Sequence, residues 1–483
     1  MNHLVVQRIL GLLLMMFSVT MVPPVVVDLI YKEQSWMPFV ESFGLTLFAG
    51  LLLWYPVRGF HKDLRLRDGF LVVAAFWAGL GMAGALPLYL SDAPVMSFTD
   101  AVFESVSGLT TTGATVLSGL DALPKAILYY RQQMQWLGGM GIIVLAVAIL
   151  PILGIGGMQL YRAETPGPMK ESKLTPRITE TAKALWYIYL SLTVACCLAY
   201  WAAGMTFFDA ISHSFSTVSI GGFSTHDASI GYFNSIWVDT IAVVFMIFSG
   251  INFSLHFFAW RNQNIQPYWQ DSELRTYLSI LGIICLISCI YLSITSDYTD
   301  LSKMFIDGIF QSISIATTTG FTTTQYQNWP SFLPMLLLFA SFLGACAGST
   351  GGGIKIVRVL LLFKQGIREI KRLIHPNALF IIKLNDKPVQ ERVINAIWGF
   401  FAAYTVVFIF LQLILMASGL DPITAFSAVA ACMNNLGPGL GDVSAHYNNI
   451  NDFAKWILCL AMLMGRLEIF TLLVLFSPVF WRK

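Results

Sequence analysis

"ATTTGFTTT", residues 316–324, places six threonines around one glycine in a chain of 483 residues that is 56% hydrophobic. A similar stretch, "LTTTGAT", occupies residues 109–115. Backbone N–H and C=O groups cannot stay unpaired in hydrocarbon, so a polar, non-helical strand is tolerated there only where it lines a wet cavity or is buried in protein. The stretch therefore predicts a polar passage inside an otherwise apolar molecule.

The stretch is one of four copies of a longer pattern. "FTDAVFESVSGLTTTGAT" from Phe98, "FFDAISHSFSTVSIGGFS" from Phe207 and "FIDGIFQSISIATTTGFT" from Phe305 align without a gap. A fourth copy, "ITAFSAVAACMNNLGPGL" from Ile423, keeps its glycine in register but has threonine where the others have aspartate. Internal repetition is the signature of an architecture built from structural repeats, and four such strands can line one axial pore.

Composition places the protein in a membrane, because its mean hydropathy is +0.68 and only 12% of its residues are charged. Shorter segments between alternate pairs of apolar stretches are predicted to be re-entrant pore helices. The predicted fold is an all-α integral membrane protein with about ten transmembrane helices. The stretches long enough to cross the hydrocarbon core lie roughly at 9–31, 37–57, 69–90, 126–153, 184–204, 236–260, 276–295, 331–363, 394–418 and 456–480.

Charge orients these spans. Lys and Arg concentrate in the linkers 58–67, 162–183 and 355–392, whereas the linkers that carry the short segments are acidic. By the positive-inside rule, the basic linkers and both termini face the cytoplasm. An acidic outer mouth would concentrate cations and repel anions.

The short helices and their strands indicate how an ion would be held. Asp100, Asp209 and Asp307 stand at the start of their helices, where we expect them to cap exposed N–H groups. The C-terminal ends of the four helices would converge and favour a cation. Glycine permits positive φ, so successive carbonyl groups can replace the water shell of an ion. The strands contain no carboxylate, which indicates a monovalent cation.

"GACAGSTGGG", residues 344–353, interrupts the span 331–363 with five glycines. Each glycine costs roughly 1 kcal/mol relative to alanine inside a helix, so this glycine loop is predicted to be non-helical at mid-membrane, just below the strands. It does not have the ending of a phosphate-binding loop, because Lys355 follows Ile354 rather than glycine.

Charged residues inside predicted spans are expensive and therefore informative. Arg466, in "MLMGRLEIFTLL", is predicted to face the pore near the glycine loop, with an interhelical salt bridge as the alternative. Glu468 is predicted to pack against another helix, and Arg131, in "YYRQQMQWLGG", to anchor its span. Polar residues at one shared repeat position are predicted to brace the strands: Glu104, His213 and Gln311.

The strands "TTTGAT", "SIGGFS", "TTTGFT" and "NNLGPGLG" resemble the filter loops of the Trk/Ktr/HKT superfamily of potassium transporters. "GGMGIIVLAVAILPILGIGGMQLYRAE" (138–164), "AGSTGGGIKIVR" (347–358), "HPNA" (375–378) and "GRLEIFTLLVLF" (465–476) are similar to its bacterial TrkH branch. The resemblance covers essentially the whole chain. It implies four M1-P-M2 pore repeats in pseudo-fourfold arrangement after two extra N-terminal helices. The implied division is 1–60 for those two helices and 61–160, 161–265, 266–375 and 376–483 for repeats 1 to 4.

The resemblance also implies the site residues. Potassium would be held by backbone oxygens just before and at the strand glycine, at Thr111, Thr112, Ile220, Gly221, Thr318, Thr319, Asn435 and Leu436, with Gly113, Gly222, Gly320 and Gly437 completing the strands. A movable gate would comprise Gly348, Gly351, Gly352, Gly353, Lys355 and Arg466. Sodium-selective members replace the first strand glycine by serine, whereas this chain has Gly113.

Similar proteins work as homodimers on a cytosolic, nucleotide-binding TrkA-like ring that takes ATP/ADP or NAD/NADH. The resemblance thus implies a multi-pass protein of the bacterial inner membrane that contacts lipid, binds K⁺ and no organic cofactor, and has no nucleic-acid partner. The basic stretch around 363–394, with Lys371 and Arg372, is predicted to meet the ring. Topology alone or anionic lipid are the alternatives for its charge.

Other function classes are weighed against these patterns. An ion-coupled secondary transporter of another solute would be expected to have two inverted halves, whereas this chain has four repeats in one orientation. Potassium symport with H⁺ or Na⁺ stays open. An intramembrane enzyme would have no reason to repeat one loop four times, and the sequence contains no nucleophile–base or zinc motif.

Overall fold

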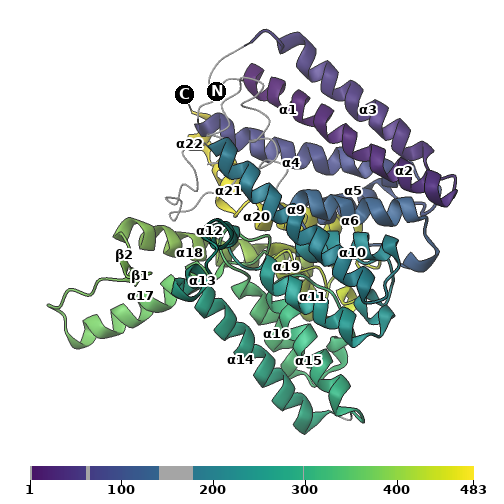
Figure 1. Ribbon diagram of the computed structural model, residues 1–483. Coiled ribbons are helices and arrows are strands. Elements are labelled where there is room, and N and C mark those ends of the chain that lie inside the picture. Colours follow the sequence, from purple (N-terminus) through teal and green to yellow (C-terminus); the bar gives the residue numbers. More distant parts are fainter. Residues whose placement is uncertain (1–2, 61–65, 141–177, 297, 483) are drawn as a thin grey trace.

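The computed structural model describes residues 3–60, 66–140, 178–296 and 298–482, which are mostly helical (Figure 1). An N-terminal helical hairpin comes first: α1 His3–Ser18, η1 Val19–Met21, α2 Val22–Tyr31, α3 Met37–Trp54 and η2 Tyr55–Val57. α1 packs so closely on α3 that a Cβ on Gly11 would lie only 2.7 Å from the carbonyl oxygen of Gly50. Small residues at such contacts let membrane helices approach each other.

Four repeats follow, each with a long helix, a short pore helix, an extended strand and a second long or broken helix. Repeat 1 contains α4 Leu66–Tyr89, α5 Phe98–Leu109, η3 Leu120–Ala122 and α6 Lys125–Gly139. Repeat 2 contains α9 Ile178–Ala202, α10 Phe207–Val218, η4 Ser229–Phe233, α11 Ile236–Ser249 and α12 Phe253–Asn262. Repeat 3 contains α13 Gln266–Gln270, α14 Ser272–Thr295, α15 Leu301–Ala316, η5 Tyr326–Asn328, α16 Phe332–Leu343 and α17 Ile356–Ile374. An antiparallel hairpin, β1 Lys383–Leu384 and β2 Lys387–Pro388, leads to repeat 4, which contains α18 Glu391–Ala417, α19 Pro422–Met433, η6 Gly441–Val443, α20 Asp452–Arg466, α21 Phe470–Phe476 and α22 Pro478–Trp481.

Within the described residues, six helices are long and apolar enough to cross a membrane, and two bent helix pairs raise this number to eight. The predicted span 331–363 consists of α16 and the start of α17, separated by the glycine loop as predicted. The predicted span 126–153 begins as α6 and then passes outside the described residues, as does most of the basic linker 162–183. The six helices are His3–Tyr31, Met37–Val57, Arg67–Tyr89, Ala182–Ala202, Ser272–Thr295 and Glu391–Ala417.

The predicted spans 236–260 and 456–480 are each broken into two helices, a bend that the sequence analysis did not predict. α11 and α12 meet at 91°, and α20 and α21 meet at 117°. At the first bend, Asn252 starts a new helix as the N-cap of α12. At the second bend, Glu468 and Ile469 adopt left-handed backbone with φ values of 55° and 41°. The length of an apolar run, on which the prediction rested, does not report such breaks.

The pore helices begin at polar caps. Asp100 and Asp209 lie in the first turn, as predicted, but the N-caps are Ser97 and Thr206, whose side chains accept hydrogen bonds from the N–H groups of Asp100 and Asp209. Each carboxylate instead accepts a hydrogen bond from the N-cap hydroxyl, at 2.8 and 2.6 Å respectively. The prediction is wrong for Asp307, because α15 begins earlier with Asp300 as its N-cap. Asp307 is instead buried in the second turn, where its carboxylate accepts a hydrogen bond from Thr323 Oγ1 at 2.7 Å.

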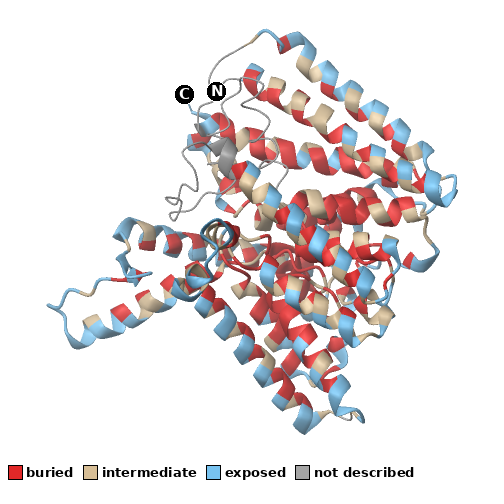
Figure 2. Cartoon of the chain, viewed as in Figure 1, coloured by how far each residue is buried: buried red, intermediate tan, exposed pale blue. Residues whose placement is uncertain are grey.

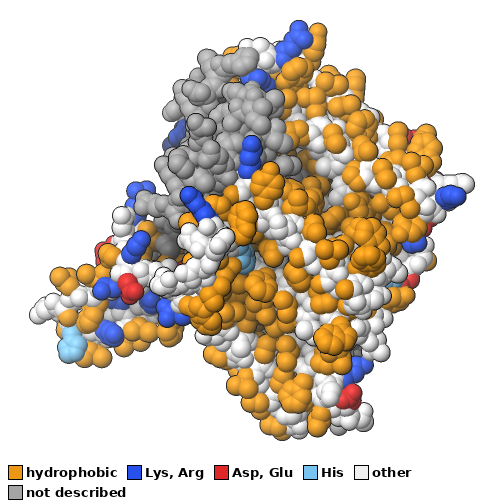
Figure 3. All heavy atoms as spheres, in the orientation of Figure 1, with side chains coloured by type: hydrophobic (Ala, Val, Ile, Leu, Met, Phe, Trp, Pro, Cys, Tyr) orange, Lys and Arg blue, Asp and Glu red, His pale blue; other side chains and the backbone are white. Residues whose placement is uncertain are grey.

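The buried residues concentrate where the repeats meet, around α5, α6, α10 and α19 (Figure 2). Hydrophobic side chains cover much of the face in Figure 3, and Lys and Arg gather on α17 and its hairpin. Both termini lie on the side of the molecule from which α17 extends (Figure 1). This arrangement is that of a membrane protein whose polar elements meet along an internal axis.

Candidate functional site

The four strands leave their pore helices in one backbone conformation. The residue two positions before each strand glycine has left-handed φ: Thr111 56°, Ile220 56°, Thr318 70° and Asn435 54°. The glycines have φ values of 81° at Gly113, 77° at Gly222, 86° at Gly320 and 93° at Gly437. The residue between them donates its N–H to the helix carbonyl five residues earlier, from Thr112 to Ser107, Gly221 to Ser216, Thr319 to Ser314 and Leu436 to Ala431. The fourth strand keeps this conformation although its sequence has diverged.

The strands form a closed ring. A Cβ on Gly113, Gly222 or Gly320 would overlap a carbonyl oxygen of the next repeat, at Gly221, Thr319 and Leu436 in turn. The ring closes where a Cβ on Gly437 would lie 2.7 Å from the carbonyl oxygen of Thr112 in the first strand. Each glycine therefore permits the neighbouring strand to approach, and all twelve predicted filter positions lie in this ring. Their contacts with an ion stay a prediction.

Threonine hydroxyls brace the strands within repeats 1 and 3. Thr110 Oγ1 is 2.7 Å from Thr112 Oγ1, and Thr317 Oγ1 is 2.8 Å from Thr319 Oγ1. Thr110 and Thr317 also donate to pore-helix carbonyls. These hydroxyls are therefore satisfied within the protein.

A buried ion pair stands behind the first strand. Glu104, which is 0% exposed, accepts hydrogen bonds from Arg131 Nε at 2.7 Å and from the N–H of Val116 at 3.0 Å. Arg131 also donates to the carbonyl of Ser224 at 3.3 Å and so joins repeats 1 and 2. Arg131 does more than anchor its span, the role predicted for it, because its charge is paired with Glu104 inside the protein.

The other residues at the repeat position of Glu104 brace their strands as predicted. His213 Nε2 is 2.9 Å from Ser224 Oγ, and Gln311 Nε2 donates to the carbonyl of Thr324 at 3.0 Å. Gln135, which sequence reasoning missed, donates from Nε2 to the carbonyl of Gly221 at 2.6 Å and accepts from the N–H of Phe223 at 3.0 Å. Its signal was the run of glutamines in "YYRQQMQWLGG", which is unusual inside a membrane helix.

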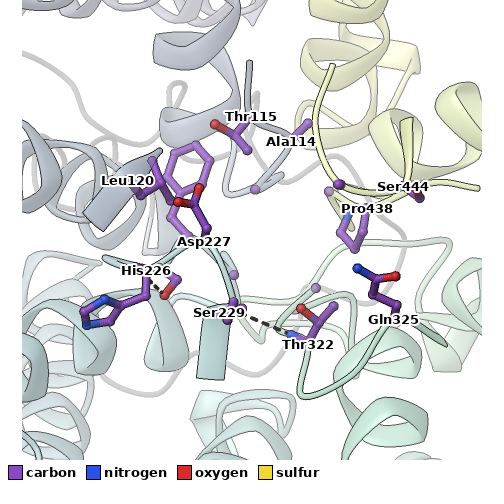
Figure 4. Close-up of a pocket in the computed structure, with 18 of the residues that line it drawn as sticks. Ala114, Thr115, Leu120, His226, Asp227, Ser229, Thr322, Gln325, Pro438 and Ser444 are labelled. Carbon is purple, nitrogen blue, oxygen red and sulfur yellow. Dashed lines mark hydrogen bonds between the residues drawn. The ribbon is translucent and has the colours of Figure 1, made fainter. Parts of the chain in front are cut away.

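A cavity of about 310 Å³ opens on one side of the ring and is bordered by all four strand glycines. Figure 4 shows Thr115, Asp227, Thr322 and Pro438 placed around this space, one from each repeat. Residues of all four repeats thus converge on one open cavity, which we call the vestibule.

His226 lies at the rim of the vestibule between two carboxylates. Its Nδ1 pairs with Asp121, and its Nε2 is 3.4 Å from Asp209 Oδ1. Burial alone would lower the pKa of His226, but hydrogen bonds and Coulomb attraction from the two carboxylates raise that pKa above its ordinary value. Burial alone would raise the pKa of Asp121, but pairing with His226 lowers the pKa of that carboxyl group below its ordinary value.

The glycine loop lies against the opposite side of the ring. The N–H of Gly352 donates to Thr318 Oγ1 at 2.8 Å, and the N–H of Gly353 donates to the carbonyl of Asn434 at 3.1 Å. Thr350 Oγ1 donates to the carbonyl of Val218 at 3.0 Å. The loop therefore contacts the pore helix or strand of repeats 2, 3 and 4.

Arg466 completes these contacts from repeat 4. Its guanidinium donates to the carbonyl of Thr350 at 3.3 Å, to the carbonyl of Gly139 at 2.8 Å and to Thr111 Oγ1 at 3.4 Å. Arg466 thus lies between the glycine loop and the first strand, near the loop as predicted. A positive charge repels nearby cations.

The neighbouring charges lie where α17 begins. Glu468 pairs with Arg358 of α17, so it packs against another helix as predicted. Lys355 Nζ donates to the carbonyl of Gly351 within the glycine loop. Lys355 itself has a φ of 80°, which marks the sharp turn from the loop into α17.

Known proteins are similar to this chain in sequence and in structure. A family profile described as "TrkH: Cation transport protein" matches residues 36–483. The chain belongs to the TrkH family. Among similar TrkH-family proteins, the "Trk system potassium uptake protein TrkH" of Vibrio parahaemolyticus is 58% identical over 478 residues, which are 99% of each chain. The protein of the same name from Escherichia coli K12 is 54% identical over 483 residues, with full coverage of both chains. A crystal structure of the potassium transporter TrkH from Vibrio parahaemolyticus matches with a TM-score of 0.91 at 55% identity, over 100% of each chain.

Proposed function

We propose that this chain takes up potassium selectively across the inner membrane of a bacterium, through the ring of four strands. The closed contact between each strand glycine and the next strand's carbonyl carries this proposal, since backbone oxygens from four sides can replace the hydration shell of a dehydrated cation. Relatives named as potassium uptake proteins support K⁺ as the transported substrate. The function is transport rather than catalysis, with both termini in the cytoplasm.

Ion flux through the purified protein in liposomes tests this proposal. We expect K⁺ and Rb⁺ to pass and Na⁺ and Li⁺ to be excluded. Equal permeability to K⁺ and Na⁺ would contradict it. Reversal potentials under imposed pH and Na⁺ gradients separate a passive pore from symport with H⁺ or Na⁺.

The glycine loop is the gate in this proposal. Its contacts with three repeats and with Arg466 support this role, because backbone and a fixed positive charge would then lie across the path that leaves the ring. We propose that Gly348, Gly351, Gly352 and Gly353 give the loop the backbone freedom to withdraw. Lys355 joins the loop to α17, so displacement of that helix would pull the loop.

Two changes test the gate independently. Deleting residues 348–352 removes the steric block, and Arg466→Ala removes the charge, so each should raise K⁺ flux under resting conditions. Arg466→Lys keeps a positive charge at a similar place and is the control for the second change. The gate proposal fails if both the deletion and Arg466→Ala conduct as poorly as the parent.

A cytosolic TrkA-like ring that binds ATP/ADP or NAD/NADH is the proposed regulator. Lys371 and Arg372 end α17 on the side of the termini, and Lys371 is exposed. The double change Lys371→Glu/Arg372→Glu should weaken co-purification with the ring and reduce nucleotide control, without altering selectivity. Arg261→Glu, an exposed basic residue at the end of α12, is the matched control. Equal ring binding by the double variant and the control would mean that the positive charge of α17 serves only to orient the protein in the membrane.

We also propose a homodimer embedded in membrane lipid. α17 extends away from the body and carries exposed apolar side chains at helical spacing, including Phe363, Ile370 and Leu373. A second copy would remove this apolar surface from water. Leu373→Arg should lower the dimer fraction measured by cross-linking in native membranes, whereas an unchanged fraction would place the contact elsewhere.

A further inference from the structure

The tip of the β1–β2 hairpin is bound to the start of α14. Its two turn residues, Asn385 and Asp386, have φ values of 45° and 60°, which is typical of a tight two-residue hairpin turn. Asn385 Oδ1 accepts a hydrogen bond from the N–H of Ser272 at 2.7 Å, and its Nδ2 donates to Asp271 Oδ2 at 3.0 Å. The first N–H groups of a helix lack partners within it, so the hairpin tip completes the cap of α14.

The next residue of α14 reaches the glycine loop. Glu273 is only 8% exposed, and one oxygen of its carboxylate accepts hydrogen bonds from the N–H of Ala347 at 2.6 Å and of Val357 at 3.2 Å. Ala347 lies before the clustered glycines, and Val357 lies in the first turn of α17. A single carboxylate oxygen therefore joins the two ends of the loop.

The hairpin is also packed against α17. Lys364 Nζ, on α17, donates to the carbonyl of Lys383 at 2.8 Å. An apolar cluster packs the two elements together and includes Leu361 of α17 and Leu384 of β1. The hairpin and α17 thus form one arm, and Figure 1 shows this arm extending from the body beside the start of α14.

The tip can leave its place without disturbing packed side chains. Asn385 and Asp386 border an open cavity of about 760 Å³, which is also lined by Trp269 and Arg275. The contacts that hold the tip are hydrogen bonds at an exposed surface, and exposed bonds of this kind are easily exchanged for bonds to water.

We propose that the hairpin tip is a latch and Glu273 a positioning residue, which together hold the glycine loop beneath the ring until the arm is displaced. Release of Asn385 would free the N-terminus of α14, and movement of Glu273 would then uncouple both ends of the loop. This mechanism rests on the proposed role of the glycine loop as the gate. It adds the residues through which a force on the cytoplasmic arm reaches the loop.

Four substitutions test the latch. Glu273→Ala removes the acceptor, whereas Glu273→Gln keeps an oxygen at the same place. Asn385→Gly keeps the left-handed turn and removes the side-chain bonds to α14, so that only the backbone N–H of residue 385 still donates to Ser272 Oγ. Asp386→Gly relaxes the same turn while leaving Asn385 in place. The readouts are K⁺ flux in liposomes without any partner and the K⁺/Na⁺ permeability ratio.

We expect Glu273→Ala and Asn385→Gly each to raise resting flux by about tenfold, because each removes hydrogen bonds made to or by a charged group. Glu273→Gln should keep resting flux close to that of the parent, and Asp386→Gly should conduct like the parent. The permeability ratio should not change in any variant, which separates a positioned gate from general loss of structure. In a variant that already lacks residues 348–352, adding Glu273→Ala should not change K⁺ flux further.

The outcomes separate the latch from the gate. If the loop deletion conducts strongly while Glu273→Ala and Asn385→Gly keep parent flux, the latch is wrong and the gate stands. If the loop deletion itself leaves flux unchanged, the gate and the latch both fail. Should Glu273→Ala not assemble in the membrane, Asn385→Gly decides the matter, since its side chain lies at an exposed turn.

Discussion

Replacing Gly113 by alanine, with Gly119→Ala as its control, tests whether the ring sets ion selection. Both glycines have left-handed backbone, with φ values of 81° and 71°, and an alanine in that region costs roughly 1–2 kcal/mol at either position. Their surroundings differ, because a Cβ on Gly113 overlaps the carbonyl oxygen of Gly221, whereas a Cβ on Gly119 meets nothing within 4 Å. Both variants therefore share the backbone strain, and any difference between them reports displacement of the Gly221 carbonyl.

The size of the effect follows from that overlap. To reach ordinary contact beyond 3.4 Å, the Gly221 carbonyl must move by about 1 Å, more than the few tenths of an ångström that a packed interior yields easily. Gln135 Nε2 holds the same oxygen at 2.6 Å from another side. A hydrogen bond to a charged group is worth ~1.5–3 kcal/mol, and we take this value for one oxygen–cation contact. At 1.4 kcal/mol per factor of ten, the K⁺/Na⁺ permeability ratio of Gly113→Ala should fall about tenfold to hundredfold.

Bi-ionic reversal potentials in liposomes measure that ratio directly. We expect Gly119→Ala to keep the parent ratio even if its thermal stability falls. Retention of the parent ratio by Gly113→Ala would refute the reasoning, and so would an equal loss of selectivity in both variants.

Two further predictions concern buried or paired charges. Arg131→Met should lower the free energy of unfolding by about 3–5 kcal/mol, because it leaves Glu104 buried without its partner. In thermal unfolding, the double variant Arg131→Met/Glu104→Gln should recover part of this loss. Equal melting temperatures of the parent and the single variant would contradict the pairing. The pKa of His226 is raised above its ordinary 6.5 in the folded state, so the stability from its carboxylate contacts is fully present below pH 6.5 and is lost as pH rises through the folded pKa. The melting temperature of the parent minus that of His226→Gln should therefore shrink as pH rises above 6.5, and a difference independent of pH would disprove this.

The ring was predictable from sequence because its geometry depends on backbone. A strand with left-handed φ that another strand must approach needs glycine, and Gly113 and its equivalents supply it at one spacing from each pore helix. The glycine loop was predictable for a similar reason, since glycines clustered from Gly351 onward destabilise a helix wherever they occur. The division into repeats at residues 60, 160, 265 and 375 stays a prediction.

Features that depend on partners distant in the sequence were not predictable. Arg131 and Glu104 are 27 positions apart, and only tertiary packing shows that each neutralises the other. Asp307 illustrates a local limit, because a second aspartate upstream took the capping role that the repeat alignment assigned to it. The bends at Asn252 and Glu468 fall inside stretches that are long and apolar enough to cross a membrane as a whole.

The ring in this protein is made by one chain, although its four strands are alike. A substitution at Gly437 alters one quarter of the ring and leaves the other three strands as they are, which four identical subunits could not allow. The glycine loop likewise belongs to repeat 3 alone, yet it touches the elements of three repeats around the axis. In the proposed gate, motion of a single segment would suffice to change the path below the ring, with no requirement for four concerted movements. We therefore expect mutations to alter ion selection and opening separately, because the proposal assigns one to a repeated structure and the other to a segment that occurs once.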